Sequence, residues 1–191
     1  MATRIGVLAL QGDFEAHQRA LARCGVEAVQ VRTPEELSSV EGLVIPGGES
    51  TTMLKLLNEE GLFEPLRRFG AEHAVFGTCA GAILVANEVS HPPQDSLHLM
   101  DISVERNAYG RQLDSRVVRV HGNNERLGCG DFEAVFIRAP IIRRVGPGAT
   151  VLAEYAGDPV LVEQGRHLVA TFHPELTDDH RVHQLFLKKV Q

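Results

Sequence analysis

The stretch AVFGTCAGAILVA, residues 74–86, decides both the fold and the chemistry of this chain. An apolar run of strand length, residues 74–76, precedes the pentapeptide GTCAG, and a second apolar run follows it. Small residues on both sides of Cys79 allow a strand to turn sharply into a helix, which is the pattern of a nucleophile elbow. Cys79 then lies beside the first free N–H groups of the helix, which stabilise an anion. The stretch therefore predicts a reactive thiolate at a strand-helix turn.

Length, charge and cysteine content limit the possible functions. The chain has 191 residues, which suits one domain over residues 1–191, and a formal net charge of −6 with its basic residues scattered. This charge pattern argues against a nucleic-acid or anionic membrane surface and favours small polar substrates or protein partners. No segment approaches the roughly 20 apolar residues of a membrane span, and no signal-peptide pattern is present. Three widely spaced cysteines suit free thiols, so we expect a cytoplasmic protein.

Strand and helix patterns alternate through the first half of the chain, which predicts an α/β fold. Its three layers would be a mostly parallel central sheet flanked by helices on both faces. We expect strands at 5–10, 28–31, 42–45 and 74–76, and helices at 14–24, 34–37, 51–60 and 62–72. After residue 100 the pattern changes to short strands, several of them antiparallel, at 102–105, 116–120, 134–137, 151–155, 160–163 and 168–171, with a last helix at 179–190. The weakest structure is expected at 89–97 and 122–131.

Two further segments supply candidate partners for Cys79. His173 and Glu175 follow a predicted strand, and an extended chain would place both side chains on one side, where the carboxylate could orient the imidazole. Gly47-Gly48 follows another strand end, so its backbone can approach a ligand closely. The N–H groups of Gly48 and Ala80 could then stabilise an oxyanion. The glycine-rich segment lacks the Gly-Lys-Ser/Thr ending of a phosphate loop, which argues against nucleotide binding.

Each of these residues also has a structural explanation. Cys79 could be a small buried hydrophobe, and His173 with Glu175 could merely end a strand before a proline turn. Their joint presence favours a Cys-His-Glu triad. We expect Cys24 to be a core residue, Cys129 an incidental loop thiol, and His180 and His183 surface residues of the last helix. The motifs predict neither a metal nor an organic cofactor.

Several of these motifs resemble the class I glutamine amidotransferases. The shared motifs are PGGESTT (46–52), FGTCAG (76–81) and HPE (173–175). More narrowly, the chain resembles the glutaminase subunits of pyridoxal 5′-phosphate synthase in LQG (10–12), VERN (104–107), GRQ (110–112), FIRAP (136–140) and FHPELT (172–177). The similarity covers nearly the whole chain, and residues 121–131 depart most from the family pattern. The resemblance implies a flavodoxin-like, three-layer fold.

The resemblance also implies an activity. Cys79 would attack the carboxamide of L-glutamine to form a γ-glutamyl thioester, with His173 as acid and base and Glu175 as its orienter. Ammonia would pass to a separate TIM-barrel synthase subunit within a large multi-subunit complex that makes pyridoxal 5′-phosphate. The implied glutamine-binding positions are Gly47, Gly48, Glu49, Arg106, Ile137 and Arg138. No cofactor is implied.

Two other classes of function stay open at this point. A cysteine peptidase or amidase of related architecture would use the same elbow on another acyl group. A noncatalytic regulatory module could keep the fold without the activity, because a fold alone does not establish function. Activity on peptides would favour the first, and an unreactive Cys79 would favour the second.

Overall fold

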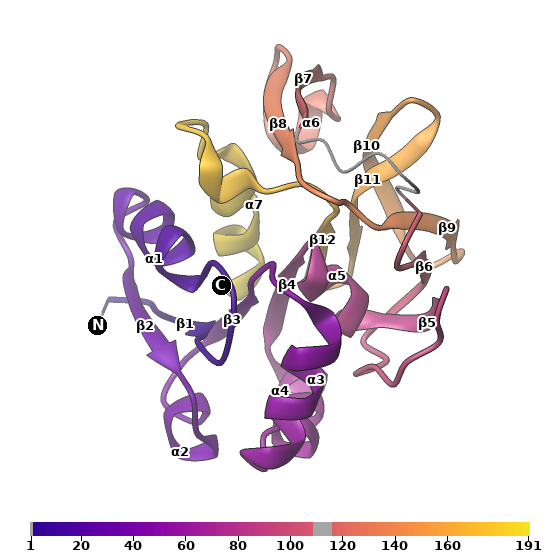
Figure 1. The fold of residues 1–191 in the computed structure, drawn as a ribbon. Coiled ribbons are helices and arrows are strands. Elements are labelled where there is room, and N and C mark those ends of the chain that lie inside the picture. The colour runs from indigo at the N-terminus through magenta and orange to yellow at the C-terminus, as the bar shows by residue number, and fades with distance from the viewer. Residues whose placement is uncertain (1, 109–115) are drawn as a thin grey trace.

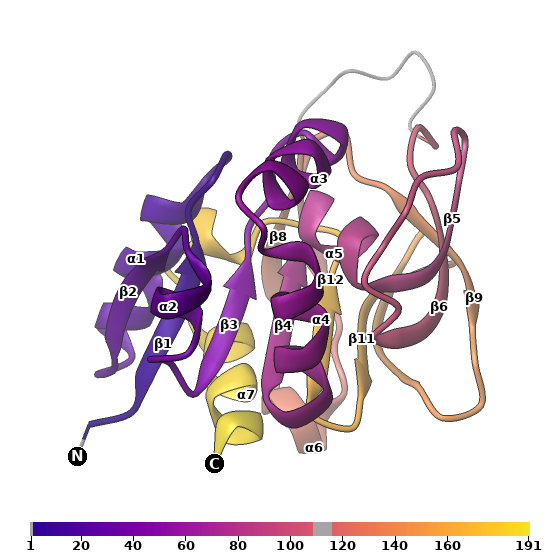
Figure 2. The ribbon, with the colours of Figure 1, turned by 90° about the horizontal axis from the view of Figure 1, so that it is seen from below.

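The computed structural model describes residues 2–108 and 116–191, and its core is a central sheet with helices on both faces (Figure 1, Figure 2). This sheet has seven strands in the order β10-β11-β12-β4-β3-β1-β2. The order confirms the predicted α/β fold with a mostly parallel sheet. In chain order the strands are β1 (Arg4–Leu8), β2 (Glu27–Val31), β3 (Gly42–Ile45), β4 (Ala74–Thr78), β10 (Thr150–Tyr155), β11 (Asp158–Gln164) and β12 (His167–Ala170).

The parallel part of the sheet runs from β2 through β1, β3 and β4 to β12, and the antiparallel strands β11 and β10 extend it at one edge. In a parallel sheet all strands end at the same edge, where ligands bind beyond their carboxyl ends. The segments that follow β3, β4 and β12 contain Gly47, Cys79 and His173 respectively. The topology therefore brings these residues to one edge from distant parts of the sequence.

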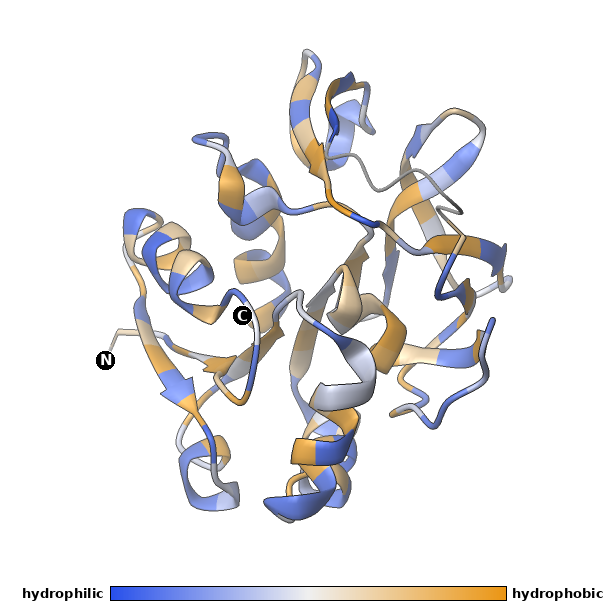
Figure 3. Cartoon of the chain, viewed as in Figure 1, coloured by the Kyte–Doolittle hydropathy of each residue, from blue (hydrophilic) through white to orange (hydrophobic). Residues whose placement is uncertain are grey.

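Side chains of the central strands alternate between two cores. In β3, Leu43 and Ile45 belong to one apolar cluster and Val44 to the other. The first core lies under the layer of α2 (Pro34–Leu37), α3 (Ser50–Glu59), α4 (Phe63–Glu72) and α5 (Ala80–Val85). The second is covered by α1 (Phe14–Arg23) and α7 (Arg181–Val190). Figure 3 shows apolar residues along the central strands and polar ones on the outer helix surfaces.

Two smaller sheets complete the second half of the chain. One has the order β5-β6-β9, in which β6 pairs with β5 in parallel and with β9 in antiparallel orientation. The other is the antiparallel pair β7-β8. Antiparallel pairing among these strands is confirmed. Their bounds are β5 (Ala86–Ser90), β6 (Met100–Glu105), β7 (Arg116–Val120), β8 (Phe132–Phe136) and β9 (Ile141–Val145).

The structure departs from the predicted elements at three places. The helix expected after the elbow is present as α5, which ends at Val85, but the strand β5 that begins at the next residue has no predicted counterpart, so the loop expected at 89–97 starts only after Ser90. The strand β9 has no predicted counterpart, since its sequence, IIRRV, lacks a clear alternation. In the loop expected at 122–131, the short helix α6 (Asn124–Leu127) forms because the Asn123 side chain accepts a hydrogen bond from the Arg126 N–H at 3.1 Å.

None of the helices in residues 2–108 and 116–191 combines the length and the apolar content of a membrane span.

Candidate active site

Cys79 lies at the turn where β4 ends and α5 begins, and its backbone has φ 51° and ψ −107°. A positive φ is strained for a residue that carries a side chain, so the surroundings must hold it in place. The Cys79 N–H donates to the Ala170 carbonyl of β12 at 2.9 Å. Glycine at position 81 lets the helix start close to β3, because a Cβ there would overlap the Ile45 carbonyl. The strand-turn-helix geometry that the sequence predicts is thus present at Cys79.

His173 and Glu175 are hydrogen-bonded to each other beyond the end of β12. His173 Nδ1 lies 2.6 Å from Glu175 Oε1, and both side chains are buried. The contact is made by a 3₁₀ turn, η1 (Pro174–Leu176), and not by the extended chain on which the prediction relied. Pro174 favours this turn because its fixed φ suits the first helical position, where no N–H is needed. The carboxylate thus orients one nitrogen of the imidazole.

The other nitrogen of His173 belongs to the Cys79 side of the site. Gly47 packs against both residues, since a Cβ there would lie 2.6 Å from His173 Cε1 and 3.3 Å from Cys79 Cβ. His173 Nε2 is buried and makes no hydrogen bond of good geometry. Burial lowers the pKa of His173, but the close polar contact with Cys79, the hydrogen bond to Glu175 and the negative charge of both groups outweigh it and raise the pKa to about 10. An imidazolium beside a cysteine thiolate is the reactive form of such a nucleophile.

One backbone and one side-chain contact from the loop after β1 hold the segment from Gly47 to Glu49. The Asp13 N–H donates to the Gly47 carbonyl at 3.2 Å, and the Glu49 N–H donates to Gln11 Oε1 at 2.9 Å. Gly12 allows this approach, because its φ is 96° and a Cβ there would overlap the Gly47 carbonyl. The LQG motif therefore positions the backbone that the sequence assigns to the oxyanion.

Glu49 and Arg106 form a charged pair at the start of α3. The Glu49 carboxylate caps the helix by accepting from the N–H groups of Thr51 at 3.1 Å and Thr52 at 2.7 Å. Burial raises the pKa of Glu49, but these hydrogen bonds and that of the Thr52 hydroxyl outweigh it, so the pKa is lowered. Arg106 Nη2 donates to Thr51 Oγ1 at 2.6 Å and lies 3.8 Å from Glu49 Oε1.

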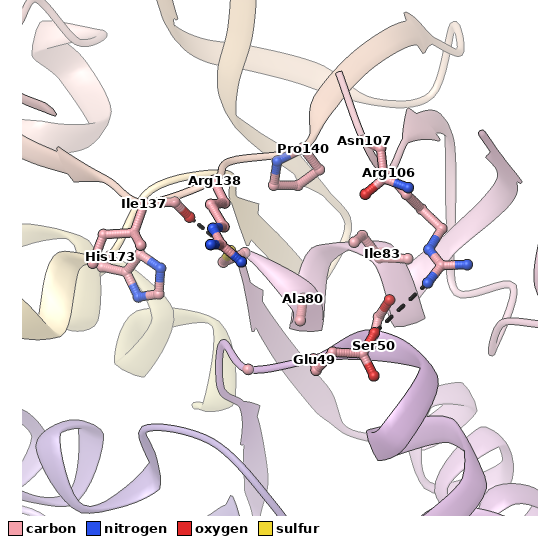
Figure 4. A pocket seen from close by; sticks show the side chains of 12 residues that line it. Glu49, Ser50, Ala80, Ile83, Arg106, Asn107, Ile137, Arg138, Pro140 and His173 are labelled. Carbon is pink, nitrogen blue, oxygen red and sulfur yellow. Dashed lines mark hydrogen bonds and ion pairs between the residues drawn. The ribbon is translucent and has the colours of Figure 1, made fainter. Parts of the chain in front are cut away.

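A pocket of about 290 Å³ joins these groups (Figure 4). In Figure 4, His173 and Arg106 lie on opposite sides of it, with Ala80 between them. The Cys79 Sγ makes a long contact of 3.8 Å with the Ile137 carbonyl. This size suits a small metabolite rather than a polymer. Of the residues assigned from the sequence, the pocket is lined by Gly48, Glu49, Cys79, Ala80, Arg106, Ile137, Arg138 and His173.

A buried polar chain behind Glu175 is absent from the sequence predictions. His17 Nε2 lies 3.0 Å from Thr78 Oγ1 and 3.3 Å from Glu175 Oε2, and its Nδ1 lies 2.9 Å from His183 Nε2. The prediction of a surface position is wrong for His183, whose side chain is fully buried. The helical repeat could have indicated this burial, because His183 lies three positions before the buried Phe186 and therefore on the same face of α7.

The other two cysteines do not line the pocket, and one possible cation site includes His173, which does. Cys24 is half-buried rather than in the core, and Cys129 is exposed. Within the described part of the chain, the donor atoms of Asp13, His173 and Glu175 lie within 4.8 Å of one another, close enough for a cation. Two of these three groups are already hydrogen-bonded to each other. The GRQ motif at 110–112 lies outside the described residues.

Comparisons with known proteins agree over nearly the full length. The SNO glutamine amidotransferase family matches residues 7–191. Pyridoxal 5′-phosphate synthase subunit PdxT of Solibacter usitatus is 61% identical over 190 residues, which cover 98% of this chain and 99% of the relative. The subunit of the same name from Koribacter versatilis is 56% identical, with 98% and 96% covered. A crystal structure of a glutamine amidotransferase superposes with a TM-score of 0.90 at 48% identity, covering 97% of this chain and 98% of the other.

Proposed function

The chain belongs to the SNO glutamine amidotransferase family, and on this basis we propose that it hydrolyses L-glutamine to L-glutamate and ammonia for pyridoxal 5′-phosphate synthesis. The observation that carries the proposal is a cysteine on a strained strand-helix turn, beside a buried His173 that is hydrogen-bonded to Glu175 at 2.6 Å. This arrangement supports acyl transfer through a covalent thioester.

In the proposed mechanism the Cys79 thiolate attacks the side-chain carbonyl carbon of glutamine. The C–N bond breaks as the His173 imidazolium gives its proton to the leaving nitrogen, which departs as ammonia. The neutral imidazole then takes a proton from water, and the resulting hydroxide attacks the thioester carbonyl. Cleavage of the S–C bond releases glutamate and restores the thiolate and the imidazolium. Glu175 keeps the His173 ring in place and stabilises its charged form through both half-reactions.

The tetrahedral intermediates carry a negative oxygen, for which we propose the N–H groups of Ala80 and Gly48 as donors. Ala80 is the first residue of α5, so its N–H has no partner within the helix. The Gly47-Gly48 peptide is anchored by the Asp13 N–H, and docking of a partner could turn this peptide toward the oxyanion. If Gly48→Pro, which lacks the N–H, kept full turnover with the partner present, the donor role of Gly48 would be wrong.

For glutamine itself we propose that the two charged rim groups recognise the amino-acid end. The Arg106 guanidinium suits the α-carboxylate, and the nearby Glu49 carboxylate suits the α-ammonium. Gly47, Ile137 and Arg138 would surround the side chain between this end and Cys79. A zwitterion then fits the rim, while the uncharged carboxamide reaches the buried thiolate.

We propose that the ammonia passes to a synthase subunit with a TIM-barrel fold in a large complex. The relatives' shared name describes them as subunits of a synthase, which supports a partner. Ammonia protonates in water and then loses its nucleophilic lone pair, so a sheltered path between subunits has a chemical reason. The chain would act as one glutaminase domain in the cytoplasm, where its free cysteines stay reduced.

The test is glutamate release from L-glutamine by the chain alone, by the chain with the synthase subunit, and by Cys79→Ala with the subunit. We expect turnover that needs Cys79 and rises sharply with the partner. Release that persists in Cys79→Ala would contradict the proposal. Absence of release from two folded subunits that bind each other would also contradict it, and would favour another acyl substrate or a noncatalytic module.

A further inference from the structure

We infer that His17 is a positioning residue whose Nε2–H, held in one tautomer by His183, steadies the Glu175 carboxylate that orients His173. This inference rests on the proposed function, in which His173 is the acid and base. Glu175 has two carboxylate oxygens in a buried site. Oε1 is bonded to His173 at 2.6 Å, whereas Oε2 has no hydrogen bond of good geometry and lies 3.3 Å from His17 Nε2.

The protonation state of the histidine pair follows from its burial. Burial, together with charge repulsion from His183 and His173, lowers the pKa of His17 well below its ordinary value. Burial and the charge of His180 lower the pKa of His183 to about 3. Both rings are therefore neutral near neutral pH, and each carries a single N–H.

Only one assignment of these protons suits the carboxylate. With the proton of His17 on Nδ1, the lone pair on Nε2 would face the negative Glu175 Oε2. With the proton on Nε2, the N–H donates to Thr78 Oγ1 at 3.0 Å, and its positive end lies beside the Glu175 Oε2 atom, 3.3 Å from Nε2, as a charge contact without a hydrogen bond of good geometry. Nδ1 of His17 then accepts the N–H of His183 Nε2 at 2.9 Å. His183 Nδ1 is buried without a partner, so the His183 proton is better placed on Nε2, where it donates to His17 Nδ1 and favours the tautomer that Glu175 needs.

His17 and His183 also connect the triad to two helices and a strand of the core. His17 is on α1, His183 on α7 and Thr78 at the end of β4, directly before the nucleophile. Both histidine side chains have no exposed surface, and the ring of Phe76 packs edge-on against each. The titratable groups that face His17 are His183 from α7, together with Glu175 and His173 from the segment around η1. Two further groups act on this set: the Asp13 carboxylate lies within 4.8 Å of the donor atoms of His173 and Glu175, and His180 lies near His183.

Loss of the His17 N–H should act on chemistry more than on binding. Without the positive N–H edge of His17 beside Oε2, the Glu175 carboxylate is held less firmly, and it orients and stabilises the His173 imidazolium less. The His173 imidazolium is then less stable, and the Cys79 thiolate loses part of the positive charge that stabilises it. We therefore expect a lower kcat, an almost unchanged KM, and a shift of Cys79 reactivity to higher pH.

The test compares two amide substitutions that differ in reach. The amide nitrogen of His17→Gln lies near the former Nε2 position, whereas the shorter side chain of His17→Asn reaches only the former Nδ1 position. Glutamate release is measured against pH with the synthase subunit present. In parallel, alkylation of Cys79 by iodoacetamide is followed against pH by peptide mass spectrometry, with Cys24 and Cys129 as internal references.

We expect His17→Asn to lower kcat by roughly 10- to 100-fold, the range seen when the group that supports a metal-bound histidine from behind is removed. Its KM should stay within about twofold, since a lost orienting contact acts on the transition state rather than on binding. The Cys79 alkylation profile should move to higher pH. His17→Gln should restore most of the rate. His183→Phe, which removes only the donor to Nδ1, should shift the profile in the same direction by less.

Leu21→Ala is the matched control, because Leu21 lies one helical turn further along α1, is fully buried and makes no polar contact with the chain of histidines. It should lower the melting temperature without moving the alkylation profile. The inference is overturned if His17→Asn keeps the wild-type kcat and profile. It is also overturned if His17→Gln and His17→Asn lose activity equally and only in proportion to the fall in their melting temperatures, which is the behaviour expected of Leu21→Ala. If the wild type releases no glutamate, the proposed function fails, while the alkylation arm still decides the role of His17.

Discussion

The two halves of the pocket differ in how their charged groups are held. In the interior half, Glu175 has no exposed side-chain surface and His173 has 8%. In the rim half, 56% of the Glu49 side chain and 11% of the Arg106 side chain are exposed. The interior groups are fixed by β4, β12, α1 and α7, whereas the rim groups lie at the first turn of α3 and just after β6.

This difference indicates that the catalytic groups are held by burial and mutual bonding, whereas the proposed recognition groups are held at the pocket rim. Buried, mutually bonded groups are in position before the substrate arrives, which is what preorganised catalysis requires. At the rim, the exposed Glu49 carboxylate is open to a zwitterion that enters from solvent, and Arg106, although largely covered, is held by single contacts at the pocket wall rather than in the core. Changes in the interior should therefore reduce kcat, and changes at the rim should raise KM.

The largest effect is expected from removal of the nucleophile. Cys79→Ala should lower glutamate release by at least roughly 10³-fold, because no other group can form the thioester. The measurement is a coupled glutamate assay with the synthase subunit present. Cys129→Ala is the control, since its exposed thiol lies in a loop away from the pocket. Equal loss of glutamate release in Cys79→Ala and Cys129→Ala would contradict the assignment of Cys79 as the nucleophile.

The orienting carboxylate should come next. Glu175→Gln should lower kcat by roughly 10²- to 10⁴-fold with little change in KM. The charge of Glu175 helps to raise the pKa of His173 to about 10, so its removal lowers that pKa. The alkaline limb of the pH-rate profile should move to lower pH. A rise in KM with an unchanged kcat would show that the interior half serves binding.

At the rim, Arg106→Lys should mainly affect affinity. Loss of a two-pronged contact with the α-carboxylate should raise KM by roughly 10- to 100-fold, with kcat within about threefold of the wild type. Arg143→Lys on β9 is the matched control, because Arg143 is half-exposed and pairs with Glu105. The prediction for Arg106 is contradicted if kcat falls while KM is constant.

The smallest effect concerns stability rather than rate. The folded chain keeps His183 neutral down to about pH 3, whereas an unfolded histidine takes up a proton below about pH 6.5. The unfolded state therefore binds more protons in this window, and the free energy of unfolding falls as the pH drops through it. The expected slope is at most about 1.4 kcal/mol per pH unit for each buried histidine. Urea titrations near pH 5 and pH 7 should show a smaller difference for His183→Phe than for the wild type.

The order of β-strands and helices in the first half follows directly from the sequence. Continuous apolar runs bounded by glycine and proline identify β1, β3 and β4, and the small residues around Cys79 identify the turn. A parallel sheet then requires Gly47 and Cys79 to meet at one edge. These inferences succeed because each depends on local composition plus one rule of topology.

The rest depends on tertiary contacts that local patterns do not encode. The turn at Pro174 is set by docking of the segment, in which the His173 N–H donates to the Val135 carbonyl of β8 at 2.8 Å. The burial of His17 and His183 requires two helices to approach from opposite ends of the sequence. A histidine on an inner helix face has no distinguishing signal until its polar partner is known.

The central claim is that Cys79 carries the substrate acyl group. We would mix wild-type chain, synthase subunit and L-glutamine, quench with acid within one turnover, and map adducts by peptide mass spectrometry. The account predicts one γ-glutamyl group on the peptide that contains Cys79 and none on those with Cys24 or Cys129. Glutamate release without any adduct on Cys79, or an adduct on another cysteine, would contradict it.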